Sequence, residues 1–591
     1  LTLCVEVPDC RAGIEVDEYV MFDHLHPTSA VHDLWAQAAL AVVPAACGNG
    51  VDEDGDGRID FGSDPGCESA SDPSELSIRQ CDNGRDDDND GTVDWRGDGT
   101  GDPHCANLSD KSEFPPPPRV QAAGPPLRVT TFDDELNSDG DCSLREAIQA
   151  ANSDAAVDAC PAGSGADAIL LRAGSYLLGS AGQLVITSDL AIRGTGNGRT
   201  VIDAAHHGRV FHVAAGTVEL SRLTLQNGRA AFDAGILNHG AVTLFRSTVR
   251  SNTAVISNGG ISNYGTMAIV DSFVVDNTAT REFDGGIFNA AGATLIIDRS
   301  TVSGNTATLN NGGIVNLGAM EIADSTVSGN NADQSVGGIA NLATMVIVDS
   351  SVSDNTATRE FNGGIFNEAG ATLTVVDSSV SGNIANLSNG GVANLGAMVI
   401  AESSVTNNVA RSEFNGGVFN DAGATLTLVN STVSGNTAEI RNGGIFSFGA
   451  LEVVNSTVSD NSAGQNGGIV GGAGSVTLKS SIVARNAGGD CRGAITSAGH
   501  NLDSDNTCNL TAAGDLPAVD PMLGPLADNG GPTETHSLLP GSPAIDAIAV
   551  ADCTDLDGDP VVTDQRGVAR PQGAGCDIGA FERAVGPTQA Q

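Results

Sequence analysis

The stretch GGIFNAAGATLIIDRSTVSGNTA, residues 285–307, decides the fold. It contains three short runs of β-prone residues, Ile-Phe-Asn, Thr-Leu-Ile-Ile and Ser-Thr-Val-Ser, separated by turns rich in Gly, Asp and Asn. Residues of this kind favour strands, and the apolar residues do not follow the spacing of a helix. The stretch therefore predicts three short strands joined by tight turns.

The same pattern recurs through the middle of the chain. Its motif is a small residue and Gly, then Ile or Val, then Asn two positions later, and its second glycine falls at positions 235, 260, 286, 313, 338, 364, 391, 417, 444 and 468. The intervals of 24 to 27 residues are typical of solenoids, whose units bury their apolar faces only by stacking. We predict a mainly β protein whose middle is a right-handed parallel β-helix of about a dozen coils.

Stacking places equivalent residues of successive coils above one another. We expect the Ile or Val after the glycines and the Val of Ser-Thr-Val to point into the core. Asn tolerates a left-handed turn, and its amide can bond to the next coil, so we interpret two Asn columns as structural ladders. These ladders comprise Asn263, Asn289, Asn316, Asn341, Asn367, Asn394 and Asn420, and Asn305, Asn330, Asn355, Asn383, Asn408, Asn436 and Asn461. We expect a stacked core column, rather than a ligand platform, from Phe288, Phe366, Phe419 and Phe446.

The charge of the chain limits its partners. With 28 basic and 73 acidic residues, the net charge of −45 repels nucleic acid phosphates and anionic lipid surfaces, so we expect no nucleic acid partner. Bound calcium or a merely solvated surface would each explain such an excess of acids. No run of about 18 consecutive apolar residues is present, so we predict no transmembrane segment.

The twelve cysteines form six couples that are close in sequence. Local disulfides are the simplest interpretation and a zinc site is the alternative, although no couple has the CxxC spacing. Disulfides imply an oxidising compartment, which predicts a secreted or cell-surface protein. The couples are Cys4/Cys10, Cys47/Cys67, Cys81/Cys105, Cys142/Cys160, Cys491/Cys508 and Cys553/Cys576.

The repeats and their flanks resemble bacterial surface proteins. The GGI-x-N and Ser-x-x-x-Asn units resemble those of polymorphic outer-membrane proteins and related β-helix proteins. The segment DDELNSDGDCSLREAIQAANSD, residues 133–154, resembles the CSLREA domain, which we expect to cap the first coil. Within it, Ser143 and Glu146 predict a capping box at the start of a helix over 144–151.

The C-terminal region resembles the choice-of-anchor Q domain. The resemblance is carried by LADNGGPTETHSLLPGSPAIDA at 526–547 and DQRGVARPQGAGCDIGAFE at 564–582. Domains of this kind accompany varied cell-surface anchors. Five polar residues there suggest a site, but we interpret them as ion-paired turn residues: His536, Asp546, Asp564, Arg566 and Asp577.

Two Asp-rich repeats stand near the N-terminus. CGNGVDEDGDGRID at 47–60 aligns with CDNGRDDDNDGTVD at 81–94. Alternate carboxylates with a glycine after the third can converge on one hard cation, and the repeats resemble calcium modules of the EF-loop or thrombospondin type 3 kind. We therefore expect Ca²⁺ as cofactor, with a solvated acidic spacer as the alternative. The expected ligands are Asp52, Asp54, Asp56, Asp60, Asp86, Asp88, Asp90 and Asp94.

The first 43 residues contain one motif that suggests catalysis. Asp23-x-x-His26-Pro-Thr, in DEYVMFDHLHPTSAVHDLW, resembles the C-terminal block of GDSL (SGNH) ester hydrolases. The resemblance implies that His26 is the general base for a serine and that Asp23 orients it. The family's Gly-Asp-Ser block is absent, so we expect this chain to be inactive as an esterase and an intact parent to hydrolyse ester bonds.

These segments predict six regions. They are a hydrolase remnant at 1–43, calcium-type repeats at 44–114, a Pro-rich linker at 115–128, a CSLREA-type cap at 129–165, the β-helix at 166–490 and a choice-of-anchor Q-like region at 491–591. We predict a surface β-helix for display, adhesion or glycan binding, with an extracellular polysaccharide or a host or cell surface as partner. One alternative is a secreted esterase or lipase, and another is a polysaccharide lyase or hydrolase on the β-helix. The sequence leaves the oligomeric state open.

Overall fold

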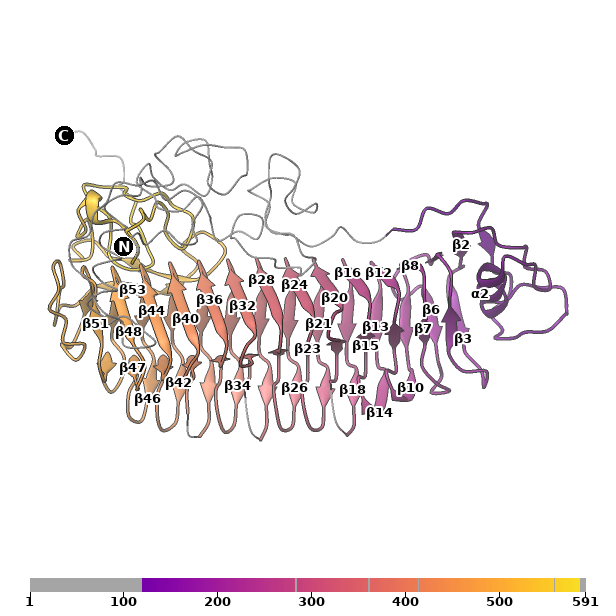
Figure 1. Cartoon of the computed structure of the whole chain (residues 1–591), viewed down its shortest axis with the longest axis horizontal. Helices are drawn as coiled ribbons and strands as arrows, with labels where there is room; N and C mark the ends of the chain where they lie inside the picture. Colours follow the sequence, from indigo (N-terminus) through magenta and orange to yellow (C-terminus); the bar gives the residue numbers. More distant parts are fainter. Residues whose placement is uncertain (1–118, 282–283, 360–361, 413, 557, 585–591) are drawn as a thin grey trace, which may run out of the picture.

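The protein is a long parallel β-helix, which confirms the predicted fold class (Figure 1). The computed structural model describes residues 119–281, 284–359, 362–412, 414–556 and 558–584. Four sheets run along the axis, and we number them in the order in which the chain meets them within a coil. They hold 13, 15, 14 and 10 strands.

The strands of the four sheets are short. The first sheet contains β4 (Leu184–Ile186), β7 (Phe211–Val213), β11 (Ile236–Asn238), β15 (Ile261–Asn263), β19 (Ile287–Asn289), β23 (Ile314–Asn316), β27 (Ile339–Asn341), β31 (Ile365–Asn367), β35 (Val392–Asn394), β39 (Val418–Asn420), β43 (Ile445–Ser447), β47 (Ile469–Gly471) and β50 (Cys491–Arg492). The second contains β1 (Leu127–Arg128), β2 (Asp167–Leu170), β5 (Leu190–Arg193), β8 (Thr217–Ser221), β12 (Ala241–Phe245), β16 (Thr266–Val270), β20 (Thr294–Asp298), β24 (Ala319–Ala323), β28 (Thr344–Val348), β32 (Thr372–Val376), β36 (Ala397–Ala401), β40 (Thr425–Val429), β44 (Ala450–Val454), β48 (Val476–Lys479) and β51 (Thr496–Ser497).

The third sheet contains β3 (Gly174–Leu177), β6 (Thr200–Asp203), β9 (Thr224–Gln226), β13 (Thr248–Arg250), β17 (Phe273–Val275), β21 (Thr301–Ser303), β25 (Thr326–Ser328), β29 (Ser351–Ser353), β33 (Ser379–Ser381), β37 (Ser404–Thr406), β41 (Thr432–Ser434), β45 (Thr457–Ser459), β49 (Ile482–Ala484) and β52 (Leu502–Asp503). The fourth contains β10 (Arg229–Phe232), β14 (Thr253–Ser257), β18 (Thr278–Ala279), β22 (Thr306–Ala307), β26 (Asn331–Ala332), β30 (Thr356–Ala357), β34 (Ile384–Ala385), β38 (Val409–Ala410), β42 (Thr437–Ala438) and β46 (Ser462–Ala463).

A coil in the middle of the rod has four strands, one more than the repeat predicts. The three predicted strands of residues 285–307 are β19, β20 and β21, and the Thr-Ala pair that follows forms β22. Strand β22 packs against the glycine pair at the start of the same coil. A Cβ added to Gly285 would lie 2.6 Å from the carbonyl oxygen of Thr306, so no larger residue fits there. The Gly-Gly motif therefore closes each coil.

The interior holds the predicted apolar columns and both amide ladders. Ile287 and Val302 are fully buried, and the Asn289 side chain donates to Asn316 Oδ1 over 2.8 Å. In the second ladder, Asn305 donates to Asn330 Oδ1 over 3.0 Å. The bonds continue through every Asn predicted for each ladder. The left-handed residue of that turn is the one before the Asn, such as Gly304.

A third polar column, of serines, was not predicted. The backbone N–H of Ser300 donates to Ser325 Oγ over 2.9 Å, and Ser300 Oγ donates to the carbonyl of Asp298. Equivalent bonds join buried serines of neighbouring coils from Ser272 to Ser456. These hydroxyls bond the backbone at the corner between the second and third sheets, where the turn leaves it without strand partners.

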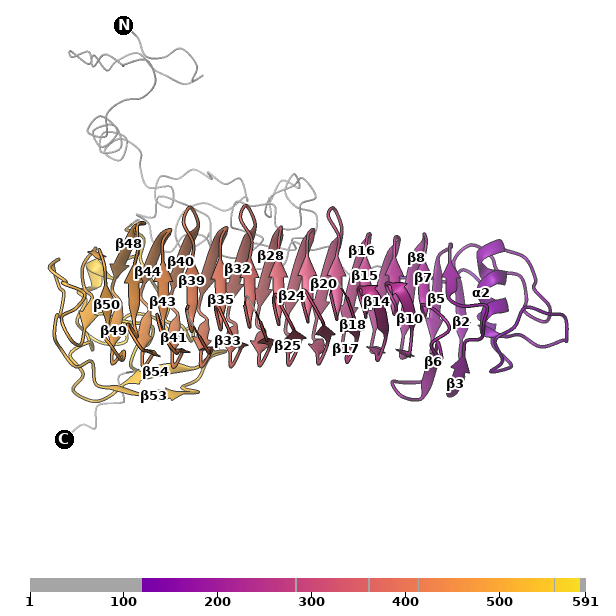
Figure 2. The same cartoon turned by 90° about the horizontal axis from the view of Figure 1, so that it is seen from below.

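Both ends of the β-helix are covered. Helix α2 (Leu144–Ser153) begins with the predicted capping box of Ser143 and Glu146 and packs its apolar side on the first coils (Figure 1). At the other end the chain folds back along the third sheet, where β53 (Leu523–Ala527) pairs with β54 (Thr535–Leu538) (Figure 2). A short 3-10 turn, η3 (Val550–Asp552), follows.

Three of the six predicted disulfides lie in the described residues. They are Cys142–Cys160 in the cap, and Cys491–Cys508 and Cys553–Cys576 in the C-terminal region. The other three couples lie outside those residues. Among the described helices, none has the length and apolar character needed to cross a bilayer.

Candidate ligand-binding surface

The outer face of the first sheet carries the aromatic residues of the repeats. The prediction of a core column is wrong, because Ile287 and Asn289 point inward and the residue between them must point outward. We call this face and its following turn the aromatic strip. It comprises His212, Leu237, Ser262, Phe288, Val315, Ala340, Phe366, Ala393, Phe419 and Phe446 in the strands, and His239, Tyr264, Ala290, Leu317, Leu342, Glu368, Leu395, Asp421 and Phe448 in the turns.

Rings contact one another at both ends of the strip. At one end His239 stacks on Tyr264 with ring centroids 5.2 Å apart, and Tyr264 contacts Phe288 at 5.8 Å. At the other end Phe446 and Phe448 lie 4.5 Å apart. Tyr264 and Phe448 remain 46% and 37% exposed. The strip therefore offers ring surface to solvent mainly at its two ends.

An ion pair between Arg209 and Asp233 lies at the first end of the strip. The Arg209 guanidinium donates to the Asp233 carbonyl over 2.5 Å and lies 3.5 Å from the Asp233 carboxylate. Asp233 also accepts from Ser262 Oγ over 2.5 Å. Burial, with Arg209 and His239 nearby, lowers the pKa of His212, so this imidazole is neutral at neutral pH. Burial raises the pKa of Tyr264.

A column of amides lies beside the strip. It consists of the residue before each glycine pair: Asn258, Asp284, Asn311, Val336, Asn362, Asn389, Asn415, Asn442 and Asn466. Val336 packs with Val315 and Ala340, which places the column against the strip. Although Asn415 is fully buried, neither end of its amide has a hydrogen-bond partner, and Asn362 Nδ2 also lacks one. Such unpaired buried groups are costly, and ordered water would satisfy them.

Asp284 is the one acid in this column between residues 258 and 466. Its Oδ1 accepts from Asn311 Nδ2 over 3.2 Å, and its Oδ2 has no partner. Burial raises the pKa of Asp284 to about 8, so the carboxyl is protonated at neutral pH. The amide column is therefore uncharged along the strip under physiological conditions.

The polar residues of the C-terminal region form ion pairs and turn bonds, as predicted. Asp564 pairs with Arg566 at 2.6 Å, and Asp577 accepts from the backbone N–H of Asp546 over 2.7 Å. Burial raises the pKa of Asp577 to about 6. A buried pair that the sequence did not reveal, Arg570 with Glu582 at 3.3 Å, joins the same turns. This group holds the C-terminal turns together.

His536 contacts Ser434, and the geometry of this pair indicates a structural role. Its Nδ1 lies 2.9 Å from the Gly524 carbonyl, which can only accept, so Nε2 accepts from Ser434 Oγ at 2.8 Å. Burial lowers the pKa of His536. Because Ser434 and His536 are only 1% and 2% exposed, no substrate can reach this pair. It fastens the C-terminal region to the third sheet.

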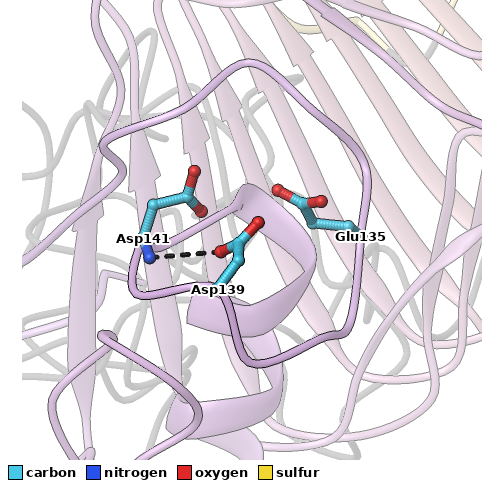
Figure 3. A group of neighbouring side chains, drawn as sticks. All are labelled: Glu135, Asp139 and Asp141. Atoms are coloured by element: carbon cyan, nitrogen blue, oxygen red, sulfur yellow. Dashed lines mark hydrogen bonds between the residues drawn. The ribbon is translucent and has the colours of Figure 1, made fainter.

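Three carboxylates gather in the loop before α2 (Figure 3). Oxygens of Glu135, Asp139 and Asp141 lie within 4.8 Å of one another, and burial followed by their mutual repulsion raises the pKa values of Glu135 and Asp141. Carboxylate oxygens of this kind can hold a calcium ion. Asn137 Nδ2 already bridges Glu135 and Asp139, at 2.7 and 3.2 Å, so we assign no ion to the group.

The site residues expected from the sequence lie elsewhere in the chain. Asp23, His26 and all eight aspartates of the calcium-type repeats fall outside the described residues. The strip itself was missed because its Phe residues were assigned to the core. Each Phe stands between two residues that point inward. This alternation is the signal that could have predicted an outward Phe side chain.

Comparisons with known proteins found few matches. No family model matches the chain, and no curated protein matches it. Among solved structures, the pectate lyase Pel9A is 14% identical, covering 78% of this chain and 98% of its own, with a TM-score of 0.24. The A-module of the mannuronan C-5 epimerase AlgE6 of Azotobacter vinelandii is 16% identical, covering 65% and 92%, with a TM-score of 0.30. We draw no functional argument from these two likenesses.

Proposed function

We propose that this chain is a secreted or cell-surface β-helix protein that binds glycan along the aromatic strip, as an adhesin or display scaffold. The observation that carries the proposal is the outer row of partly exposed rings, which aliphatic residues interrupt in the middle coils: Tyr264, Phe288, Phe366, Phe419 and Phe448. Aromatic rings stack on the apolar faces of sugars. Three described disulfides support an oxidising compartment.

Removing a ring at either end of the strip should weaken glycan binding. We expect Tyr264→Ala and Phe448→Ala each to reduce the affinity of the full chain for a soluble polysaccharide by about three- to tenfold, because each loses roughly 0.5–1.5 kcal/mol of ring contact. Isothermal calorimetry measures this. Phe273→Ala is the matched control, since Phe273 is 45% exposed but lies on the third sheet. Equal losses in all three variants would contradict the proposal.

A second candidate function is a polysaccharide lyase or hydrolase on the β-helix. It is favoured by four side chains at the first end of the strip: Arg209, His212, His239 and Tyr264. They place the neutral imidazole of His212 and the phenol of Tyr264 on one face. New reducing or unsaturated ends in a polysaccharide incubated with the full chain would favour this candidate. Retention of the polysaccharide without cleavage favours the binding function.

We further propose that the two Asp-rich repeats bind calcium and stiffen a spacer. Calorimetric titration of the full chain should show saturable binding of about two ions, one for each loop. Asp54→Asn with Asp88→Asn should remove that binding, because each loop loses a central carboxylate. An unchanged isotherm in the double variant, or no binding at millimolar calcium, would contradict the assignment.

The N-terminal motif leads to a further proposal, about ester hydrolysis. We propose that Asp23 and His26 belong to a GDSL-type ester hydrolase that the β-helix carries. The support is the resemblance of the Asp-x-x-His-Pro-Thr motif alone. Coding sequence upstream that contains a Gly-Asp-Ser block would support this proposal, and its absence would count against it.

A further inference from the structure

The aromatic strip differs in charge from the rest of the chain. Three columns form this surface between residues 258 and 466, namely the outward strand residues, the turn residues and the amide column, and they include no Lys, Arg or His. Their acids are Asp284, Glu368 and Asp421. Asp284 is buried and protonated at neutral pH, so two charges remain on this surface between residues 258 and 466.

This charge pattern disfavours a polyanion. A chain of uronate or sulfate groups on the strip would meet Glu368 and Asp421 and no cation in the three columns, on a protein of net charge −45. At the first end of the strip, the Arg209 guanidinium is held 3.5 Å from the Asp233 carboxylate, and other arginines lie on the turns beyond the amide column. Arg359 pairs with Asp333 at 3.2 Å, and Arg441 lies over the ring of Phe414.

A polycation would bind elsewhere. Acids are stacked in successive coils at the corner between the second and third sheets, on a different side of the rod from the first sheet. They are Asp324, Asp349, Asp377 and Glu402, whereas the preceding coils carry Arg246, Asp271 and Arg299 at this position, and Asp271 pairs with both arginines. Like charges one coil apart attract a polycation more strongly than the two separated acids of the strip do.

The aromatic strip runs parallel to the helix axis. Its equivalent residues repeat once in each coil, and the strands lie side by side along the axis from β15 to β43 (Figure 2). With a strand spacing of about 4.8 Å, the seven coil steps from Tyr264 to Phe448 span about 34 Å. An extended polymer that runs parallel to the axis meets the same three columns throughout.

We propose that the aromatic strip takes an extended, uncharged polysaccharide chain that lies parallel to the helix axis. This rests on the proposed function, and it names the class of glycan. Recognition comes from contact of the rings and aliphatic side chains with the sugar faces, so binding is insensitive to salt. The affinity increases with oligomer length until the ligand spans the strip.

The test compares three probes on the full chain by calorimetry: neutral β-glucan oligomers of increasing length, polygalacturonate and chitosan. Binding is measured for the wild type, for Tyr264→Ala/Phe448→Ala and for the control Phe273→Ala. We expect the neutral oligomers to bind more tightly with length up to about 34 Å, and the double variant to lose about tenfold or more. Tyr264→Phe, which keeps the ring, should retain the affinity.

The outcomes separate this inference from the proposed function. In one outcome polygalacturonate or chitosan binds, the double variant abolishes this binding, and the neutral oligomers do not bind. The strip then binds glycan, but the class of glycan proposed here is wrong. If no probe shows binding that depends on Tyr264 and Phe448, both the inference and the proposed function are overturned.

Discussion

Replacing Asn355 by Ala is expected to destabilise the β-helix by about 3–5 kcal/mol. The Asn355 side chain is fully buried and makes four bonds: Oδ1 accepts from the backbone N–H and the amide of Asn330, and Nδ2 donates to the Val327 carbonyl and to Asn383 Oδ1. Removing it leaves these partners unpaired in the interior, at about 1–3 kcal/mol for each group that finds no substitute. Urea unfolding followed by circular dichroism measures the loss.

Ser353→Ala is the control for this prediction, because Ser353 lies in the same coil but points outward and is partly exposed. We expect it to change the free energy of unfolding by less than about 0.5 kcal/mol. Hydrogen exchange should show that the effect of Asn355→Ala is greatest in residues 339–367, since each coil contacts only its neighbours. A loss below about 1 kcal/mol for Asn355→Ala would contradict the structural role of the ladder.

Asp284→Asn should remove a pH dependence of stability. The carboxyl has a pKa of about 8 in the folded chain and a model value of 3.8. A folded pKa above the unfolded one means that the folded state holds the proton more tightly, so stability is complete below about pH 4 and is lost as the pH rises to about 8. Each pH unit in that window costs about 1.4 kcal/mol, so up to about 4 kcal/mol is lost between pH 5 and pH 8.

The variant has a structural precedent within the chain, because Asn occupies this position in most other coils. An amide at 284 would also carry a donor for Asn258 Oδ1, which has no partner one coil earlier. We therefore expect the variant to equal the wild type near pH 4 and to exceed it in unfolding free energy at pH 8 to 9. Parallel stability curves for the two proteins across this range would show that Asp284 does not carry the proton.

Most of the fold could be predicted because one unit repeats. The spacing of the Gly-Gly motif gave the solenoid, and the recurring Asn305 and Asn289 positions gave both ladders. The strand β22 was missed because two residues, Thr306 and Ala307, carry too little pattern to identify a strand. The serine column was missed because a Ser in a turn signals no partner, and its bonds appear only when coils stack.

The candidate site could not be predicted, for a reason that Phe288 illustrates. In a strand of three residues, alternation gives two inward positions and one outward position, and hydrophobicity alone assigned the Phe to the core. Inside this narrow rod Ile287 and Asn289 already fill that space. The pairing of Arg209 with Asp233 and the protonation of Asp284 depend on contacts between coils, which the order of residues does not show.

The claim that the aromatic strip is the binding surface is tested most directly by hydroxyl-radical footprinting of the full chain with and without a soluble neutral glucan. We predict that bound glucan protects Tyr264, Phe448 and the half-exposed rings between them from oxidation, while Phe273 on the third sheet reacts equally in both samples. Protection of Phe273 instead, or unchanged oxidation of Tyr264 and Phe448 under conditions where the glucan binds, would contradict the account.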